Sequence, residues 1–503
     1  MDRPTPSTLP PRSAGLFLAA AVALAALLRL PCLHAELWLD EVWSWEFARA
    51  AATPWEIFAG PNHHHDNNHK LNTLYLYFVP DGLPYPWYRL HSLAAGLAAV
   101  PLAFRAAARR GALAALFAAL LVAADYWFVL CSAEARGYAL ALALALAAFD
   151  GLQRYLRDGR PPYLLQFWLA VMLGFLAHLT FLPTYLALVV WSVYHFARHR
   201  LTKGSEVHQL VRVHAVPACF VLVLYFADIR GMQLGGGDAL PLYVTVGRLL
   251  CFGLGAPFSP LNAGLAAVAV FAVLARGWRV LRRDGDDSWV FFLMATVGGP
   301  LMLLARQSGF VYERYFFQSF LFFLILLAYV LADLARRGPA GKVAAGVAVG
   351  LICAGNLGEV ADFLRGDGRG HFRRALEYIA EQSDGREVTV TSDSDLRVPK
   401  MLAFYNHYQK PPLRYEYVGL DDWKERAFRY GSLAGPTGRF GYSRLHTAEW
   451  LIVESPEHVV RDPPDRLEFP GAADATYELE AKYEVGARGG WDWYVYRRVV
   501  VAP

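Results

Sequence analysis

The chain has 503 residues, of which 55% are hydrophobic and 18% are charged, and its formal net charge is +4. A soluble protein of this size would carry about 25% charged residues. The deficit lies in residues 1–361, which hold long apolar runs, whereas residues 362–503 have the composition of an ordinary soluble domain. This composition excludes a soluble protein, and because the basic residues lie mainly beside the apolar runs, they favour membrane topology over nucleic-acid binding.

The apolar runs predict a helical membrane protein with many spans, because about 20 mainly apolar residues are needed to cross the hydrocarbon core. The first run lacks a clear small-residue cleavage site, so it predicts a retained helix rather than a signal peptide. We predict about 11 spans, at residues 14–33, 88–107, 111–130, 136–153, 163–181, 183–198, 211–228, 262–281, 288–305, 316–335 and 341–361.

The connections between these spans predict the orientation of the chain, because cytoplasmic loops carry an excess of Lys and Arg. With the N-terminus inside, the cytoplasmic side receives five basic clusters, at residues 105–110, 154–160, 198–203, 276–283 and 336–342. The opposite connections are long and polar (34–87), tight or mixed, and the odd number of spans places the C-terminal end outside. The polar loops are therefore expected on the non-cytoplasmic side.

Two apolar pieces, at residues 71–79 and 245–257, are too short or too broken by Gly and Pro to span a bilayer. We predict that both are partly buried or re-entrant segments on the outer side, where protein or a cavity covers the backbone.

The C-terminal part predicts a separate α/β domain at residues 362–503, following a transmembrane domain at residues 1–361. Its periodicity indicates helices at residues 372–383 and 399–408 and strands at residues 387–391 and 449–453. A closing antiparallel pair is expected at residues 477–485 and 491–500. Helices mixed with strands in this order predict a small α/β domain on the outer surface.

The first outer loop begins with two adjacent carboxylates, Asp40 and Glu41, among Trp38, Trp43 and Trp45. Acids beside aromatic side chains at the bilayer surface are well placed for raised pKa values and for general-base work. The alternative is an interfacial aromatic belt with two solvated acids.

The same loop continues with four His and one Asp between residues 63 and 69. Imidazole and carboxylate groups are ligands for divalent metals, and Asp66 and His69 lead directly into the apolar segment that follows. We predict these two as tentative metal ligands, and the alternative is a polar loop without a ligand role.

Two further outer segments carry charged groups close to the membrane. Glu134 and Arg136 lie in a tight hairpin, where charges are costly unless they are paired or functional, and a structural salt bridge is the competing interpretation. Arg314, between Tyr312 and Tyr315, is suited to binding a lipid-linked phosphate, against the alternative of snorkelling to ordinary phospholipid. Arg89, at the start of the second span, has the same two interpretations.

These segments resemble the GT-C class of membrane glycosyltransferases, specifically the bacterial relatives of dolichyl-phosphate-mannose protein mannosyltransferases and of the lipid A aminoarabinose transferase. The resemblance covers essentially the whole chain. Its motifs are the Asp-Glu pair at residues 40–41, Asn-His-x-Leu-Asn-Thr at 68–73, Arg-Leu at 89–90, Glu-Ala-Arg-x-Tyr-Ala at 134–139, Arg-Tyr-Phe at 314–316 and the segment 490–498.

The resemblance implies a GT-C fold with a C-terminal extracytoplasmic α/β domain in a bacterial inner membrane. It implies transfer of a sugar from a polyprenyl-phosphate carrier to a lipid, glycan or protein acceptor on the outer face. The catalytic residues implied are Asp40 as base, with Glu41 and Glu134. The substrate- and phosphate-binding residues implied are Asn68, Lys70, Arg89, Arg136, Tyr312, Arg314 and Tyr315. A divalent metal held by Glu41, Asp66 or His69 could share in stabilising the phosphate.

Two other functions are compatible with these patterns. A transporter or flippase would show internal repeats and charges at mid-membrane, but the sequence has no convincing repeat and its charges gather at the outer ends of the spans. A non-catalytic assembly partner in envelope-polysaccharide synthesis is the third candidate, and the retained Asp40 argues against it.

Overall fold

The computed structural model describes residues 11–60, 62–199, 205–232, 241–305, 311–366, 368–394, 397–419, 448–456, 463–469, 475–485 and 490–499. The chain divides into two compact units. The first unit comprises residues 1–33, 44–80 and 86–360, and the second comprises residues 34–43, 81–85 and 361–503. The second unit therefore contains two short pieces of the first predicted outer loop as well as the C-terminal part.

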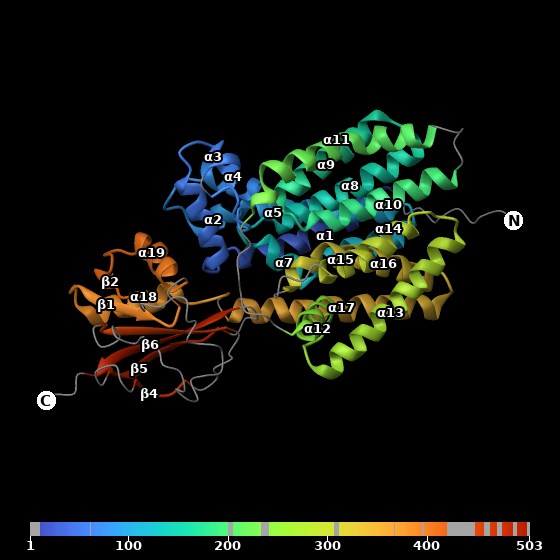
Figure 1. Ribbon diagram of the computed structural model, residues 1–503. Coiled ribbons are helices and arrows are strands. Elements are labelled where there is room, and N and C mark those ends of the chain that lie inside the picture. Colours follow the sequence, from blue (N-terminus) through green and yellow to red (C-terminus); the bar gives the residue numbers. More distant parts are fainter. Residues whose placement is uncertain are drawn as a thin grey trace. The chain divides into compact units, whose positions relative to one another are not determined.

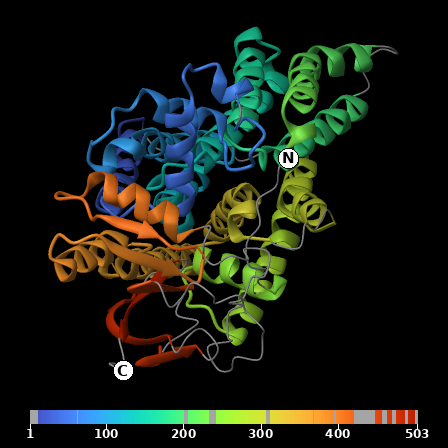
Figure 2. The same cartoon turned by 60° about the vertical axis from the view of Figure 1, so that its left-hand side comes forward.

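Among the described residues of the first unit, the regular elements are all helices, joined by turns and loops (Figure 1). Its main helices are α1 (Pro11–Cys32), α5 (Tyr85–Ala108), α6 (Ala112–Ala124), α7 (Tyr126–Ser132), α8 (Tyr138–Asp158), α9 (Pro161–Ala177), α10 (Phe181–Arg198), α11 (Ser205–Ala227), α12 (Leu242–Gly253), α13 (Pro260–Arg283), α14 (Trp289–Leu293), α15 (Gly299–Ala305), α16 (Phe317–Ala335) and α17 (Pro339–Arg365). Helices α8 to α11 lie side by side in both cartoon views (Figures 1 and 2). The remaining helical pieces are α2 (Leu39–Ala50), which runs from the second unit into the first, α3 (Glu56–Ala59), α4 (Lys70–Phe78) and the single turns η1 (Ile229–Gly231), η2 (Met294–Gly298) and η3 (Glu313–Phe316).

Each of the eleven predicted spans coincides with a helix or with two or three consecutive helical pieces. Among the described residues, seven helices are long and apolar enough to cross a membrane by themselves, and α6 with α7 makes an eighth if this bent pair is one span. The two predicted short segments form α4 and α12, which have 9 and 12 residues and are too short to span. A polytopic helical membrane protein is therefore confirmed, while the count of eleven spans stays a prediction.

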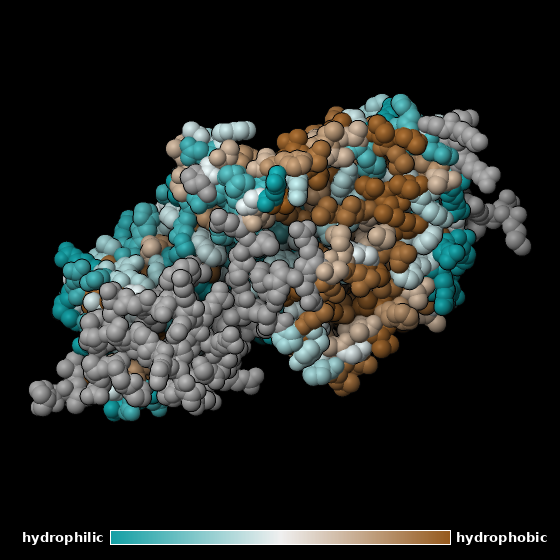
Figure 3. Space-filling model, viewed as in Figure 1, coloured by the Kyte–Doolittle hydropathy of each residue, from teal (hydrophilic) through white to brown (hydrophobic). Residues whose placement is uncertain are grey.

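The surface of the first unit explains why this chain needs a bilayer. Figure 3 shows apolar residues gathered over its helices. On α13, for example, the exposed fractions of Leu261, Val268 and Phe271 are 72%, 69% and 74%. Contiguous apolar surface of this kind is rare on soluble monomers, and hydrocarbon would cover it without cost.

The break between α6 and α7 brings polar groups into the helical unit. The two helices meet at an angle of 59° around Asp125. The Asp125 carboxylate accepts a hydrogen bond from the backbone N–H of Phe128 at 3.1 Å and so caps α7. The side-chain oxygen of Asn356, on α17, accepts from the N–H of Tyr126 at 2.7 Å. These bonds satisfy donors that the break frees.

Arg29, near the end of α1, donates hydrogen bonds to carbonyl oxygens at the α6 side of the same break. Its guanidinium is fully buried and donates to the carbonyl oxygens of Ala123 at 2.7 Å and Val122 at 3.2 Å, and to the hydroxyl of Ser132 at 3.2 Å. We expect Arg29→Met to lower the free energy of unfolding by at least about 2 kcal/mol, because several buried acceptors would lose their donor. Thermal unfolding in detergent measures this effect. The matched control is Arg109→Met at an exposed position of the first unit, and equal midpoints for the two variants would contradict the prediction.

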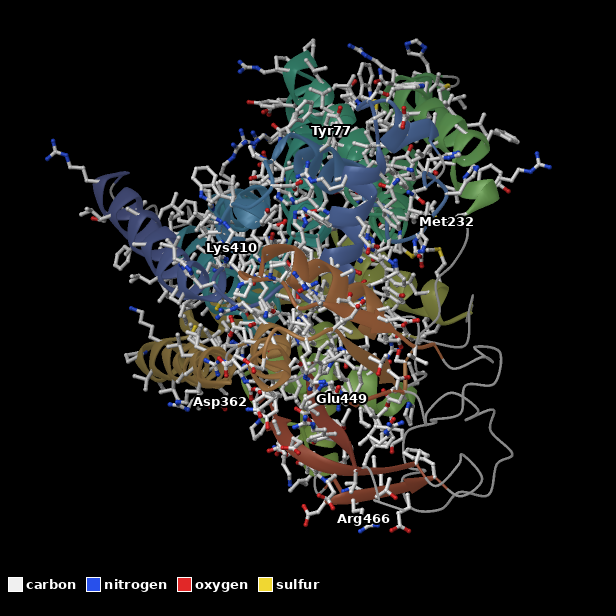
Figure 4. All side chains as sticks on the ribbon, turned by 90° about the vertical axis from the view of Figure 1, so that its left-hand side faces the viewer. Tyr77, Met232, Asp362, Lys410, Glu449 and Arg466 are labelled. Carbon is white, nitrogen blue, oxygen red and sulfur yellow. The ribbon has the colours of Figure 1, made fainter. Side chains whose placement is uncertain are left out.

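The second unit is an α/β domain with a six-stranded mixed sheet. The strands are β1 (Val388–Ser392), β2 (Tyr415–Tyr417), β3 (Trp450–Pro456), β4 (Arg466–Phe469), β5 (Ala475–Tyr483) and β6 (Trp491–Val499), in the order β2-β1-β3-β6-β5-β4. Strands β2, β1 and β3 are parallel, and the remaining neighbours are antiparallel. Figure 4 labels Glu449, which precedes β3, and Arg466, which begins the edge strand β4.

Two helices complete this domain, α18 (Phe372–Ser383) and α19 (Val398–Tyr408). The ring of Phe372 packs against that of Trp493 on β6 with their centroids 5.0 Å apart. The hydroxyl of Tyr405 donates to the carbonyl oxygen of Leu37 at 2.6 Å, which ties the piece 34–43 to α19. The two predicted helices, the two predicted single strands and the closing antiparallel pair are all present, and β2 and β4 are additional. Residues 486–489, which join the pair, lie outside the described residues.

Candidate functional site

The centre of the candidate site is the hairpin between α7 and α8, which carries Arg136 and Gly137. The N–H of Gly137 donates to Nδ1 of His69 at 3.0 Å, and a Cβ built at Gly137 would lie 1.9 Å from the carbonyl oxygen of Ala177. Only glycine allows this close approach. The hairpin is therefore held between the N-terminal end of α4 and the C-terminal end of α9, with Arg136 fixed beside His69.

Arg136 is buried, and polar side chains from two other segments hold its guanidinium. One terminal nitrogen, Nη1, donates to the Oγ of Ser44 at 3.2 Å and to the side-chain oxygen of Asn67. The other, Nη2, lies 3.3 Å from Nε2 of His69. The hydroxyl of Ser92 donates to the Arg136 carbonyl oxygen at 3.0 Å. This is a preorganised cation whose position is set by α2, α4 and α5.

The environment of His69 makes it a second hydrogen-bond donor. Burial, followed by the positive charge of Arg136, holds the pKa of His69 well below its usual value, so the ring is neutral at physiological pH. Because Nδ1 accepts the bond from Gly137, the single ring proton resides on Nε2. The Nε2–H group and the Arg136 guanidinium are then two donors side by side, an arrangement that suits an anion which accepts from both.

Arg314 brings a second guanidinium to the same place. The positive charges of Arg136 and Arg314 both act on His178, which follows α9. Both arginines also lower the pKa of His69. Arg136 and Arg314 therefore both act electrostatically on the same two imidazoles, although the two arginines are far apart in the sequence.

Aromatic rings surround this cationic cluster. The ring centroid of His69 lies 4.2 Å from that of His178 and 5.4 Å from that of Tyr138, and the Tyr138 and His178 centroids are 4.3 Å apart. The guanidinium carbon of Arg314 lies 4.6 Å from the Tyr312 ring centroid, and Tyr312 packs edge-on against Tyr315. These rings orient the arginines through cation–π contact and keep bulk water away from them.

The Lys70 ammonium is already paired with other groups of this region. Its ammonium forms an ion pair with Asp228 at 3.2 Å, with both side chains only 6% exposed, and it also donates to the carbonyl oxygen of Ile57 at 3.3 Å and to that of His63. Burial lowers the pKa of Lys70, while Asp228 opposes that shift. The described contacts therefore favour a structural role for Lys70 over phosphate binding.

We expect Lys70→Met to lower the free energy of unfolding by about 3–5 kcal/mol, because it leaves a buried carboxylate without its cation. The double variant Lys70→Met/Asp228→Leu should recover part of this loss, since it removes both charges. Denaturation of the full chain in detergent measures both variants. A Lys70→Met protein of unchanged stability but raised KM for the lipid donor would instead support the phosphate-binding role.

The other predicted binding residues have local partners. The side-chain amide of Asn68 donates to the carbonyl oxygens of Ile57 at 3.0 Å and Asn62 at 3.2 Å, which holds the His-rich loop in shape. Arg89 is buried and donates to the carbonyl oxygen of Leu33 at 2.8 Å, near the C-terminal end of α1. Neither bond tests a role in substrate binding, so both roles stay predictions.

The predicted acids lie at helix ends. Asp40 and Glu41 form the first turn of α2, and the Glu41 carboxylate accepts from the backbone N–H of Trp38 at 3.2 Å. Residues four apart on a helix share one face, so Asp40 lies on the face of α2 that also carries Ser44, a partner of Arg136. Glu134 is buried in the hairpin, and its carbonyl oxygen accepts from the N–H of Arg136 at 2.8 Å.

The metal prediction does not fit the geometry around His69. Its Nδ1 lone pair is used by Gly137, and its Nε2 faces a guanidinium, so it has no lone pair to offer a metal. Among the described residues of this region, the group with suitable spacing is His63, His64 and Asp228, and it includes neither Asp66 nor His69. Because Lys70 already neutralises Asp228, that group is a poor competitor for a cation.

Four residues that the sequence did not single out contribute to the cluster: Ser44, Asn67, His178 and Asp228. Asn67 and Ser44 lie beside predicted residues, so proximity in sequence was a weak signal for them. His178 and Asp228 lie at the ends of apolar spans, where a polar side chain is costly without a partner. In the sequence, only this energetic cost of a polar side chain could have identified His178 and Asp228 as candidates.

This fold has known counterparts among membrane glycosyltransferases. The chain is similar to the apo structure of ArnT from Cupriavidus metallidurans, with 14% identity and a TM-score of 0.55, over 96% of this chain and 98% of that one. It is also similar to the apo oligosaccharyltransferase of Archaeoglobus fulgidus, with 10% identity and a TM-score of 0.53, over 87% of this chain and 69% of that one. AglB from the same archaeon, solved with an inhibitory peptide and a dolichol-phosphate, gives 11% identity and a TM-score of 0.50 over 88% and 69%.

No protein-family model and no curated protein matches the chain. At identities this low, the structural similarity establishes the fold. The chain is thus a polytopic helical protein with the GT-C fold and a C-terminal sheet domain, as the sequence motifs indicated.

Proposed function

We propose that this protein transfers a sugar from a polyprenyl-phosphate-linked donor to an acceptor on the non-cytoplasmic face of a bacterial inner membrane. The observation that carries the proposal is the buried Arg136 guanidinium, which lies beside His69 and whose positive charge acts on that imidazole together with the charge of Arg314. Two fixed cations and an Nε2–H donor at the end of an apolar helical unit suit a phosphate that is attached to a lipid. The neighbours with the same fold, ArnT and the archaeal oligosaccharyltransferases, support the same chemistry.

The chemistry requires one bond to form and one to break. An acceptor hydroxyl oxygen attacks the anomeric carbon of the sugar, the bond from that carbon to the phosphate oxygen breaks, and the hydroxyl proton passes to a carboxylate. The bonding electrons leave with the polyprenyl phosphate, so negative charge grows on the phosphate as the bond breaks. Preorganised donors aimed at that charge stabilise the transition state more than the ground state.

The residues divide between these tasks. Arg136 and Arg314 would hold the phosphate and stabilise its developing charge, with the Nε2–H group of His69 as a further donor. Asp40 would accept the acceptor proton, with Glu41 and Glu134 as the other candidate carboxylates. A divalent metal, if this enzyme uses one, would add positive charge at the phosphate, and no step proposed for these residues depends on it.

The lipid carrier would enter from the bilayer between helices. The orientation that follows from the basic clusters places the candidate site and the second unit outside the cytoplasm. In this proposal the α/β unit would hold the acceptor, which is a lipid, a glycan or a protein.

Activity measured with the purified chain, a synthetic polyprenyl-phosphate sugar and an envelope extract as acceptor tests this function. Release of free polyprenyl phosphate that depends on the acceptor supports transfer. Movement of the lipid-linked sugar across a proteoliposome membrane without cleavage would instead support a flippase and overturn the proposal.

A further inference from the structure

A second group of polar residues lies apart from the proposed active site, around the C-terminal end of α10. His195 and His199 are four residues apart on this helix and therefore lie on one face. The connection between α13 and α14 places Asp287 beside them. One carboxylate oxygen of Asp287, Oδ2, forms a short contact with Nδ1 of His195 and lies 3.6 Å from Nε2 of His199.

The geometry of these three groups matches that of metal ligands. Their ligand atoms all lie within 4.8 Å of one another. Two ligands on one tetrahedral zinc ion, each about 2.0–2.1 Å from the metal, are separated by about 3.4 Å. The separation of His199 and Asp287, 3.6 Å, already has this size, and the short His195–Asp287 contact would widen when an ion enters.

Asp287 differs from the two other acids of the same connection, Asp284 and Asp286, in the partners of its carboxylate. Asp284 and Asp286 both form ion pairs with Arg110, at 2.6 and 2.8 Å. Among the described residues, no Arg or Lys pairs with Asp287, whose partners are the two imidazoles and the indole N–H of Trp191. Its negative charge is therefore available to a bound cation.

The surroundings also provide orientation and access. The indole N–H of Trp191 donates to Oδ1 of Asp287 at 3.1 Å, which leaves Oδ2 facing the imidazoles. Bonds of this kind commonly orient metal-binding carboxylates. The side chains of His195 and Asp287 are 17% and 14% exposed, while that of His199 is 55% exposed. An ion could therefore enter past His199 and keep water at a remaining position.

We propose that His195, His199 and Asp287 bind a divalent transition metal ion of the zinc type. Two imidazoles and one carboxylate are a ligand set that suits Zn²⁺ and Co²⁺ and does not suit Mg²⁺ or Ca²⁺, which prefer oxygen ligands. The ion joins α10 to the connection between α13 and α14, and it stabilises the packing of these helices. This site is independent of sugar transfer, because none of its ligands belongs to the proposed active site.

The test uses the full chain in detergent, treated with EDTA and without a polyhistidine tag. All proteins carry His63→Ala and His64→Ala, which removes the other candidate group of metal ligands. Zinc is then titrated while the thermal unfolding midpoint is followed, and Co²⁺ absorption in the visible range reports the ligand set. His199→Ala is the test variant, because its exposed side chain contributes little to the metal-free fold, and His208→Ala on α11 is the matched exposed control.

We expect zinc to raise the midpoint of the background protein and of the His208→Ala variant. We expect His199→Ala to keep the metal-free midpoint and to bind zinc at least about tenfold more weakly. If excess zinc leaves the midpoint of the background protein unchanged, the three residues are only a structural hydrogen-bonded group and the site does not exist. Equal zinc affinity of the His199→Ala and His208→Ala variants would place the metal elsewhere and overturn the proposal.

Discussion

Replacing Arg136 with methionine is expected to lower the rate of sugar transfer by about 10²–10³-fold, the cost of removing one preorganised donor from a developing negative charge. The guanidinium is buried and is held by Ser44 and Asn67, while the Ser92 hydroxyl fixes the carbonyl oxygen of the same residue. The loss should fall on kcat more than on KM, because the charge on the phosphate grows in the transition state. Steady-state release of polyprenyl phosphate measures both constants.

A buried arginine also contributes to folding, and the experiment must separate the two effects. Arg136→Lys keeps the charge but loses the forked geometry, so we expect an activity between those of the wild type and of Arg136→Met. Arg154→Met is the matched control, because Arg154 pairs with Asp150 on α8 and does not belong to the cluster. If Arg136→Met unfolds at the wild-type temperature and retains wild-type kcat, the phosphate-binding role is wrong.

Replacing Asp40 with asparagine is expected to reduce transfer by about 10²–10⁴-fold, the usual contribution of a positioned general base. The substitution keeps the size of the side chain and removes its ability to take a proton. Because Asp40 lies in the first turn of α2, asparagine also remains acceptable for the helix end. Expression in the membrane and the unfolding midpoint should therefore stay close to those of the wild type.

The control for Asp40→Asn is the replacement of a second acid on the same helix. Glu46→Gln removes a half-buried carboxylate from another face of α2 and should leave the rate within about a factor of two, because Glu46 is not one of the carboxylates assigned to proton transfer. A donor with a better leaving group than polyprenyl phosphate should not rescue Asp40→Asn, because the missing step is proton removal from the acceptor. Full activity of Asp40→Asn in the membrane assay would falsify the assignment of the base and move it to Glu41 or Glu134.

The two predictions test different parts of the proposed function. If both variants are inactive but bind lipid donor as tightly as the wild type, charge stabilisation and proton transfer are both supported. If Arg136→Met fails only to bind the donor, the guanidinium holds the ground state and Arg314 becomes the candidate for the transition-state charge.

The sequence alone determined the helical framework of this protein. Apolar runs of about 20 residues have few structural solutions, because a bilayer requires every backbone polar group to be satisfied within the segment. The predicted spans therefore coincide with helices throughout the first unit. In the second unit, amphipathic and alternating patterns found α18, α19 and the long strands, whereas β2 and β4, with three and four residues, are too short to carry a period.

The tertiary structure decided which polar residues act together. The hairpin motif marked Arg136, yet its partners Ser44 and Asn67 are 92 and 69 residues away in the sequence, and no local pattern encodes such a distance. The His-rich loop suggested a metal at His69, but the folded chain uses the lone pair of Nδ1 for Gly137 and makes the ring a hydrogen-bond donor. Likewise, the positive charge of Lys70 suggested a phosphate ligand, but in the folded chain Lys70 forms an ion pair with Asp228, which follows α11.

The physical reason for this division is the range of the interactions. Crossing a membrane and forming a helix depend on neighbouring residues, so the sequence determined both. The charge, tautomer and partner of a buried polar group depend on what distant segments bring to it, because burial makes an unpaired polar group costly. The motifs were visible in the sequence, but only the packing of α2, α4, α9 and the hairpin around Arg136 brought them together as a candidate phosphate site.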